Sequence, residues 1–223
     1  VKTVEQARKT GFDNISVDLM MRTPYQTKDS FLESVRRALL LPITHMSVYG
    51  LSIEEHTAFG VMQKRGESLN LADEETEREM YLEASSLLSK NGFSHYEISN
   101  FAREGFESRH NLKYWRGEEY IGVGASAHGY LDSVRYSHPR SIKSFCDSPL
   151  KRESEEIITK DEQIREKILL GLRLSHGVDF STLPVELTPS FTSLTQRLSR
   201  AGLLTKKNGT IALTPQGFLL SNT

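Results

Sequence analysis

The chain has 223 residues, of which 37% are hydrophobic and 26% are charged, a balance typical of a globular protein with one large or two small domains. Its formal net charge of −1 excludes a global field that would draw it to nucleic acid or to membranes. The single cysteine, Cys146, excludes an internal disulfide and indicates a reducing compartment, and no apolar run approaches the roughly 20 residues of a membrane span. We therefore expect a cytoplasmic protein without stable membrane insertion.

The first half of the chain alternates predicted strands with predicted helices. Strands are predicted at 15–20, 45–51 and 93–98, where β-branched and apolar residues cluster. Between them, Thr27 and Asp73 are predicted N-caps of helices that have one apolar face. This order predicts an α/β fold with a parallel sheet and right-handed crossovers, and three strands are too few for a closed barrel. Because a predicted helix begins at the first residue, we expect the chain to be part of a longer protein.

The middle of the chain carries weaker signals. Residues 117–131 are rich in glycine but lack the Lys-Ser/Thr pair of a phosphate-binding loop. This pattern predicts close packing of the backbone against a sheet or a planar ligand. His128 within it is a second candidate metal ligand, with a structural role as the alternative. Residues 132–158 are polar, contain two prolines and are predicted to form a linker.

The last part of the chain predicts a separate helical domain. Thr159 and Glu162 form a capping box at the start of an apolar helical pattern. Farther on, Asn208-Gly209 between two short apolar runs is a strong hairpin signal. Helices followed by a hairpin predict a winged-helix-like domain at 159–223, after a first domain at 1–131.

Aromatic and basic residues gather around position 110, beside the only tryptophan of the chain. His110 is a candidate iron ligand, Tyr114 and Trp115 can cover a flat ring, and Arg109 and Arg116 can bind carboxylates. A flat, aromatic, anionic ligand needs these groups together. The alternative is a core histidine that is hydrogen-bonded beneath the tryptophan.

Two segments, Tyr96–Ala102 and Arg109–Trp115, resemble the oxygen-independent coproporphyrinogen III oxidase-like family of radical S-adenosylmethionine (SAM) proteins, and within it the haem chaperone branch. Supporting segments are Ser47–Glu54, Gly122–His128 and Gly171–Leu174. The resemblance covers nearly the whole chain. It implies a partial parallel (β/α) barrel, a truncated TIM-like fold that holds SAM and a 4Fe–4S cluster, followed by a C-terminal helical domain.

The same resemblance implies that the cluster cysteines belong to an N-terminal Cys-x-x-x-Cys-x-x-Cys loop, which this sequence does not contain. Cys146 by itself cannot hold a four-iron cluster, which needs several thiolates. We therefore expect SAM and the 4Fe–4S cluster to be cofactors of a full-length parent and this chain alone to be inactive. Whether the parent acts as an enzyme stays open.

By resemblance, Asp18 near the C-terminal end of a strand accepts hydrogen bonds from the ribose of SAM, and Gln26 is a second SAM contact. The alternatives are an aspartate bonded to a neighbouring loop and a glutamine that satisfies the backbone. Arg22 stands where the family has a glycine. If the loop needs a positive φ there, arginine costs free energy that glycine would not.

The resemblance also assigns contacts with haem or a porphyrin to His110, Asn111, Tyr114 and Trp115, with His110 as the haem iron ligand. It implies a haem chaperone that binds haem and delivers it to a haem-accepting protein. The alternative within the family is an oxidase that decarboxylates coproporphyrinogen III to protoporphyrinogen IX.

An alternative of another class is a winged-helix regulator that binds DNA. Arg197, Arg200, Lys206 and Lys207 lie in a segment, 188–223, that contains no acidic residue. Because the chain as a whole is not basic, we expect no nucleic-acid partner.

Overall fold

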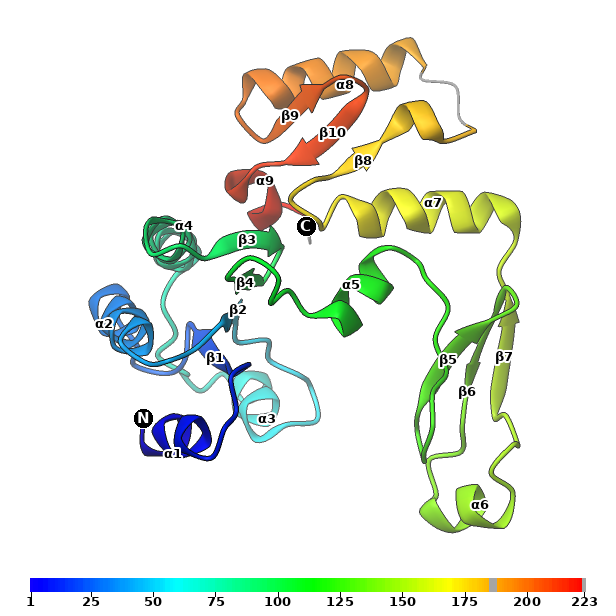
Figure 1. The fold of residues 1–223 in the computed structure, drawn as a ribbon, viewed down its shortest axis with the longest axis horizontal. Coiled ribbons are helices and arrows are strands. Elements are labelled where there is room, and N and C mark those ends of the chain that lie inside the picture. Colours follow the sequence, from blue (N-terminus) through cyan, green and yellow to red (C-terminus); the bar gives the residue numbers. More distant parts are fainter. Residues whose placement is uncertain (185–187, 222–223) are drawn as a thin grey trace. The chain divides into compact units, whose positions relative to one another are not determined.

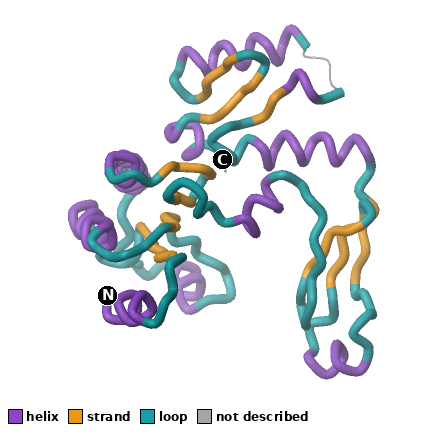
Figure 2. Tube along the Cα trace, in the orientation of Figure 1, coloured by secondary structure: helices purple, strands orange, loops and turns teal. Residues whose placement is uncertain are grey.

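The computed structural model describes residues 1–184 and 188–221 (Figure 1), and Figure 2 marks the helices and strands along the same trace. The domain predicted at 159–223 includes residues 185–187 and 222–223, which lie outside the described residues. No helix in the described part of the chain combines the length and the apolar character that crossing a membrane requires.

Packing divides the chain into two compact units. The first combines residues 1–107 with 196–204 and the chain from 213 onward, and the second combines 108–195 with 205–212. The C-terminal segments are thus shared between the units. Each unit is described by itself below.

The first unit is built on a four-stranded sheet with the order β1-β2-β4-β3. Its strands are β1 (Ser16–Met21), β2 (His45–Gly50), β3 (Ser94–Glu97) and β4 (Asn100–Ala102). β1 and β2 are parallel, and β4 runs antiparallel to both of its neighbours. The α/β class is confirmed, but the prediction of an all-parallel sheet is wrong at β4.

A two-residue turn explains this extra strand. β3 ends at Glu97 and β4 begins at Asn100, so the chain reverses over Ile98 and Ser99. The Ser99 backbone N–H donates to the Glu97 carboxylate over 3.1 Å and holds the turn. Antiparallel neighbours need only such a hairpin, so β4 takes the place beside β2. The turn contains no glycine, and the sequence pattern therefore missed it.

Two amphipathic helices, α2 (Lys28–Leu39) and α4 (Glu74–Lys90), supply much of the apolar core of this unit. Thr27 and Asp73 cap them as predicted, because their side chains accept backbone hydrogen bonds of 3.2 and 2.7 Å from the first turns. The core they form with the sheet includes Phe31, Leu32, Val35, Met46, Val48, Met80, Ala84, Leu88 and Phe101.

Three shorter helices complete the first unit. They are α1 (Lys2–Lys9), α3 (Ala58–Lys64) and α9 (Pro215–Leu219). α9 begins after Thr214, whose side chain caps it, and its Phe218 is buried in the same core. The far C-terminal part of the chain therefore stabilises the sheet that the N-terminal half forms.

The second unit contains an antiparallel sheet with the order β5-β6-β7. Its strands are β5 (His128–Leu131), β6 (Val134–Ser137) and β7 (Ser154–Ile157), with α6 (Ile142–Asp147) between the last two. The prediction of a linker at 132–158 is therefore wrong. All four residues of β7 are exposed, so its polar, charged sequence resembles that of a loop.

Helices α5 (Arg109–Trp115) and α7 (Lys160–Gly171) pack against each other within the second unit. α7 begins with the predicted capping box. The Thr159 N–H donates to the Glu162 carboxylate over 2.8 Å, and the Glu162 N–H donates to the Thr159 hydroxyl over 3.3 Å.

The C-terminal elements include the predicted helix and hairpin. They are β8 (Val178–Asp179), a 3-10 turn at Phe180–Thr182, α8 (Pro189–Arg200), β9 (Leu204–Lys207) and β10 (Thr210–Leu213), with the sheet order β8-β10-β9. Asn208 and Gly209 have φ angles of 50° and 84°, the left-handed pair of a tight hairpin. β8 was missed because two residues carry no periodic pattern.

Candidate functional site

One face of the first unit's sheet is polar. Along β1, Val17, Leu19 and Met21 are more buried than their neighbours, while Ser16 and Asp18 are exposed on the other face. This is the period-two alternation of a strand that packs on one side only. The opposite face is thus open to a ligand.

Three strands contribute a row of polar side chains to that face. Asp18 pairs with Ser47 of β2, and Ser47 pairs with Asn100 of β4. Asn100 is only 7% exposed, and its Oδ1 atom is buried without a hydrogen-bond partner among the described residues. Asp18 lies in the middle of β1, so its predicted place near the strand's C-terminal end is wrong.

A second polar row crosses the sheet two residues earlier along β1 and β2, at Ser16 and His45. Ser16 Oγ lies 2.8 Å from His45 Nδ1, and the Tyr96 hydroxyl lies 2.8 Å from His45 Nε2. Burial lowers the pKa of His45, and the carboxylates of Asp18 and Glu107 partly oppose that effect. The hydrogen bonds orient the imidazole, which sequence reasoning had not connected to any partner.

The loop after β1 contains the predicted departure from the family. Arg22 has a φ of 61°, so the positive φ that the glycine of the family suggested is indeed required here. Its guanidinium donates to the Ala72 carbonyl over 3.1 Å and forms an ion pair with Glu77 at 3.1 Å. These contacts hold a conformation that non-glycine residues disfavour.

Gln26 lies in the same loop and braces it. Its amide Nε2 donates to the Met20 carbonyl over 3.2 Å, and its Oε1 accepts from the Thr23 N–H at 3.3 Å. This arrangement matches the alternative in which the glutamine satisfies the backbone. Any contact of Gln26 with SAM stays a prediction.

A cavity of about 1090 Å³ opens at the carboxyl ends of β1 and β2, the edge where parallel sheets gather their ligands. Its walls come from the ends of both strands, the first turns of α4 and the helix α9. The polar residues that line it are Arg22, Tyr49, Asp73, Glu74, Glu75, Glu77, Arg78, Tyr81 and Ser99.

In the second unit, α5 carries the predicted haem residues. His110 is exposed, and the Tyr114 hydroxyl lies 3.2 Å from its Nε2 atom, with the two rings edge to face at 5.0 Å. Tyr114 also meets Tyr120 edge to face at 4.6 Å. Asn111 is partly buried, and its backbone N–H donates to the Ser108 hydroxyl over 3.3 Å. The helix therefore brings a histidine and a phenol together, and the phenol of Tyr120, beyond the helix, lies beside them.

Trp115 is partly buried on the same helix. The guanidinium of Arg173 lies over its ring, 5.5 Å from the centroid, which is within the range of a cation–π contact. The indole Nε1 is buried and has no hydrogen-bond acceptor among the described residues. Of the predicted carboxylate binders, Arg116 lies 3.8 Å from Glu118, and Arg109 is exposed.

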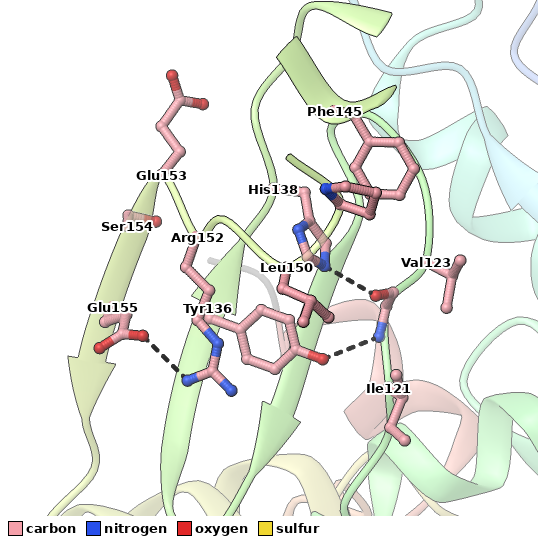
Figure 3. A pocket seen from close by; sticks show the side chains of 12 residues that line it. Ile121, Val123, Tyr136, His138, Phe145, Leu150, Arg152, Glu153, Ser154 and Glu155 are labelled. Atoms are coloured by element: carbon pink, nitrogen blue, oxygen red, sulfur yellow. Dashed lines mark hydrogen bonds and ion pairs between the residues drawn. The ribbon is translucent and has the colours of Figure 1, made fainter. Parts of the chain in front are cut away.

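The glycine-rich segment shapes a different cavity, of about 730 Å³, in the second unit (Figure 3). A Cβ atom at Gly122 would overlap the backbone of His128, and one at Gly129 would overlap the ring of Tyr136. The predicted close packing of this backbone is confirmed. The His128 side chain itself is exposed and does not line this cavity.

His138, which sequence reasoning missed, lies in the wall of this cavity. It is 7% exposed, with Nδ1 3.0 Å from the Lys151 carbonyl and Nε2 3.1 Å from the Gly122 carbonyl. Both ring nitrogens are therefore engaged by the backbone, which indicates a structural role. Its spacing from other polar residues gave no signal in the sequence.

Within residues 1–184 and 188–221, no three His, Cys, Asp or Glu side chains gather in a way that could hold a metal ion. Cys146, on α6, is an exposed free thiol. A four-iron cluster needs several thiolates, so the residues of this chain do not fit that cofactor.

Comparison with known proteins shows which proteins this chain is similar to. Residues 158–220 match the family model of the HemN C-terminal domain. "Heme chaperone HemW" of Lactococcus lactis subsp. lactis is 38% identical across 99% of this chain, and that of Bacillus subtilis is 39% identical across 98%; 59% of each relative is covered. The chain fits the HemN-like family, near HemW. It spans about three fifths of the length of these HemW relatives.

The fold agrees with this likeness to HemN-like proteins. A solved structure titled "Coproporphyrinogen III oxidase (HemN) from Escherichia coli is a Radical SAM enzyme" matches with a TM-score of 0.75. The match covers 99% of this chain and 56% of that one, at 19% identity. At that identity, the likeness shows the shared fold alone.

Proposed function

We propose that this protein is a haem chaperone of the radical SAM class, which binds haem and passes it to a haem-accepting protein. The observation that supports this most is the 38–39% identity to two HemW proteins across almost the whole chain. Because the chain spans only part of those relatives, SAM and the 4Fe–4S cluster belong to the complete protein in this proposal.

The haem cargo is assigned to the helix α5. His110 is exposed and reachable, and the Tyr114 hydroxyl holds its Nε2 atom, so Nδ1 is the ring nitrogen that remains for the iron. Trp115 offers a ring and an indole N–H that has no acceptor among the described residues. Arg173 supplies positive charge beside that ring for the propionates of haem.

SAM is assigned to the polar face of the first unit's sheet. A ribose has two neighbouring hydroxyl donors, and the Asp18 carboxylate is an exposed acceptor beside Ser47. The unsatisfied Oδ1 of Asn100 on the same row supports a further donor from the ligand. When bound, SAM and the cluster supply radical chemistry; the residues of this chain bind and orient SAM.

The test of the haem site is a haem titration of the full-length protein and its His110→Ala variant, followed by the Soret band. We expect the affinity to fall about tenfold or more and the Soret maximum to shift, because an axial ligand is lost. His128→Ala, which removes an exposed histidine of the second unit, is the control and should bind haem like the unaltered protein. Equal affinity and an equal Soret position for His110→Ala would exclude His110 as the ligand.

One alternative function within the family is that of an oxidase, in which the full-length protein decarboxylates coproporphyrinogen III. The fold shared with a coproporphyrinogen III oxidase supports it. An anaerobic incubation of the reconstituted full-length protein with SAM and coproporphyrinogen III separates the two functions. The chaperone proposal expects no protoporphyrinogen IX, and catalytic turnover to that product would favour the oxidase.

A further inference from the structure

The loop after β1 contains a strained residue with an unusual support. Arg22 adopts a left-handed conformation, with a φ of 61°, which L-residues other than glycine disfavour. Strain of this kind persists only where the surroundings over-determine it. Here the support consists of two contacts, one with Ala72 just before α4 and one with Glu77 within α4.

Both contacts are made by the guanidinium of Arg22. Its Nε donates to the Ala72 carbonyl over 3.1 Å, and its Nη1 lies 3.1 Å from a carboxylate oxygen of Glu77. The two side chains are 30% and 22% exposed, so the ion pair is shielded more than a surface pair. A glycine at this position would adopt the same φ without either contact.

Glu77 also touches the end of the neighbouring strand. Gly50, the last residue of β2, pairs with Met21 of β1, and a Cβ atom at Gly50 would overlap the Glu77 carboxylate. One carboxylate therefore lies against the end of β2 while it holds the loop that follows β1. Arg22, Gly50 and Glu77 all line the cavity at the carboxyl ends of these strands.

The loop that Arg22 begins leads directly to α2. Gln26 closes it through hydrogen bonds to the Met20 carbonyl and the Thr23 N–H. At its far end, Lys28 forms ion pairs of 2.8 Å with Glu79 and with Glu83 of α4. Ion pairs with α4 therefore flank the loop on both sides, and the Arg22–Glu77 pair is the one beside the sheet.

We propose that Arg22 and Glu77 form a clamp that positions the loop of residues 22–27 against α4. The clamp thereby shapes the cavity at the carboxyl ends of β1 and β2 and fixes the place of Gln26, the second SAM contact that the resemblance implies. Arg22 is a positioning residue in this proposal, because it acts through the loop rather than on the ligand. A glycine at position 22 would adopt the positive φ without support, whereas Arg22 needs its contact with Glu77 to hold that conformation. Glu77 is therefore needed for the loop conformation only while position 22 is an arginine. The part that concerns SAM rests on the proposed function.

The clamp itself is tested by thermal unfolding of this chain in a double-mutant cycle. Glu77→Gln should lower the melting temperature by at least about 2 °C, because Arg22 keeps its strained φ and loses its counter-charge. Arg22→Gly should not lower it by as much, and Glu77→Gln in the Arg22→Gly background should have little further effect. Additive losses from the two single variants would overturn the clamp.

The effect on SAM is measured by calorimetry with the full-length protein, at a temperature where every variant is folded. Glu77→Gln should weaken SAM binding about tenfold, and the Arg22→Gly/Glu77→Gln protein should return to within about twofold of Arg22→Gly. Glu33→Gln, which breaks the exposed Arg36–Glu33 pair on α2 away from this cavity, is the matched control and should leave SAM affinity unchanged. A merely structural clamp would not produce this rescue of affinity.

The outcomes separate the two ideas. If the unaltered protein binds SAM and Glu77→Gln binds it equally well, the positioning role is overturned. If the unaltered full-length protein does not bind SAM at all, the proposed function fails, and the unfolding cycle still decides whether Arg22 and Glu77 are coupled.

Discussion

Among single residues, His95 has the surroundings that most restrict its protonation. Its ring stacks on Phe101 at 4.2 Å, and Phe218 meets it edge to face at 5.3 Å. The Tyr81 hydroxyl donates to the Ile98 carbonyl over 2.7 Å, so its oxygen can accept from His95 Nε2 at 3.3 Å. Burial lowers the pKa of His95 from 6.5 to about 4, because these apolar neighbours disfavour the imidazolium.

This pKa predicts a loss of stability in acid. Between pH 6.5 and about pH 4, His95 is protonated in the unfolded chain but neutral in the folded protein. Because the unfolded state then binds one more proton, the free energy of unfolding falls as the pH drops through that window. The loss from this residue is up to about 3 kcal/mol. His95→Phe keeps the stacking without titration, and its urea unfolding should change less between pH 7 and pH 4. The same pH dependence in both proteins would contradict the assignment.

Among the elements, the β5–β6 hairpin depends on a glycine. Gly129 and Tyr136 are paired in the register, and a Cβ atom at Gly129 would overlap the tyrosine ring. Arg152 lies 4.2 Å from the centroid of that ring, which limits its room to move. Gly129→Ala should therefore lower the free energy of unfolding by about 1–3 kcal/mol, measured with urea.

His128→Ala is the control for this element, since it alters an exposed side chain on the same strand. It should change the stability by no more than about 0.5 kcal/mol. Equal losses from both variants would show that the strand, rather than the contact with the Tyr136 ring, is sensitive to substitution.

For the whole molecule, the cysteine content predicts the outcome of cluster reconstitution. The sequence has one cysteine, and Cys146 is exposed on α6. A protein of this sequence, treated anaerobically with iron and sulfide, should bind no four-iron cluster, because a cluster needs several thiolates. The measurements are iron and sulfide analysis and the visible absorbance. A stoichiometric cluster would refute the view that this chain lacks the ligands.

The net charge of the whole molecule bears on the DNA-binding alternative. A gel shift with random duplex DNA at physiological salt should show no complex, since the net charge is −1. A salt-sensitive shift that disappears when Arg197, Arg200, Lys206 and Lys207 are neutralised would favour the regulator.

Local chemistry explains what could be predicted. Thr27, Asp73 and Thr159 cap helices through contacts that span only three residues, and Asn208-Gly209 forms a turn by its own backbone preference. These features need no distant partner, so the sequence located them within a residue or two. The positive φ at position 22 was suggested in the same way, by the glycine that the family has there.

Residue patterns by themselves determined the α/β class, the capped helices, the hairpin and the resemblance that the HemW relatives support, because each depends on nearby residues or on whole motifs. Only the tertiary structure decided that β4 runs antiparallel beside β2, that 132–158 contributes the strands β6 and β7 to a sheet, and that Glu77 supports Arg22. These depend on partners 17 to 57 residues apart, about which local propensity carries no information.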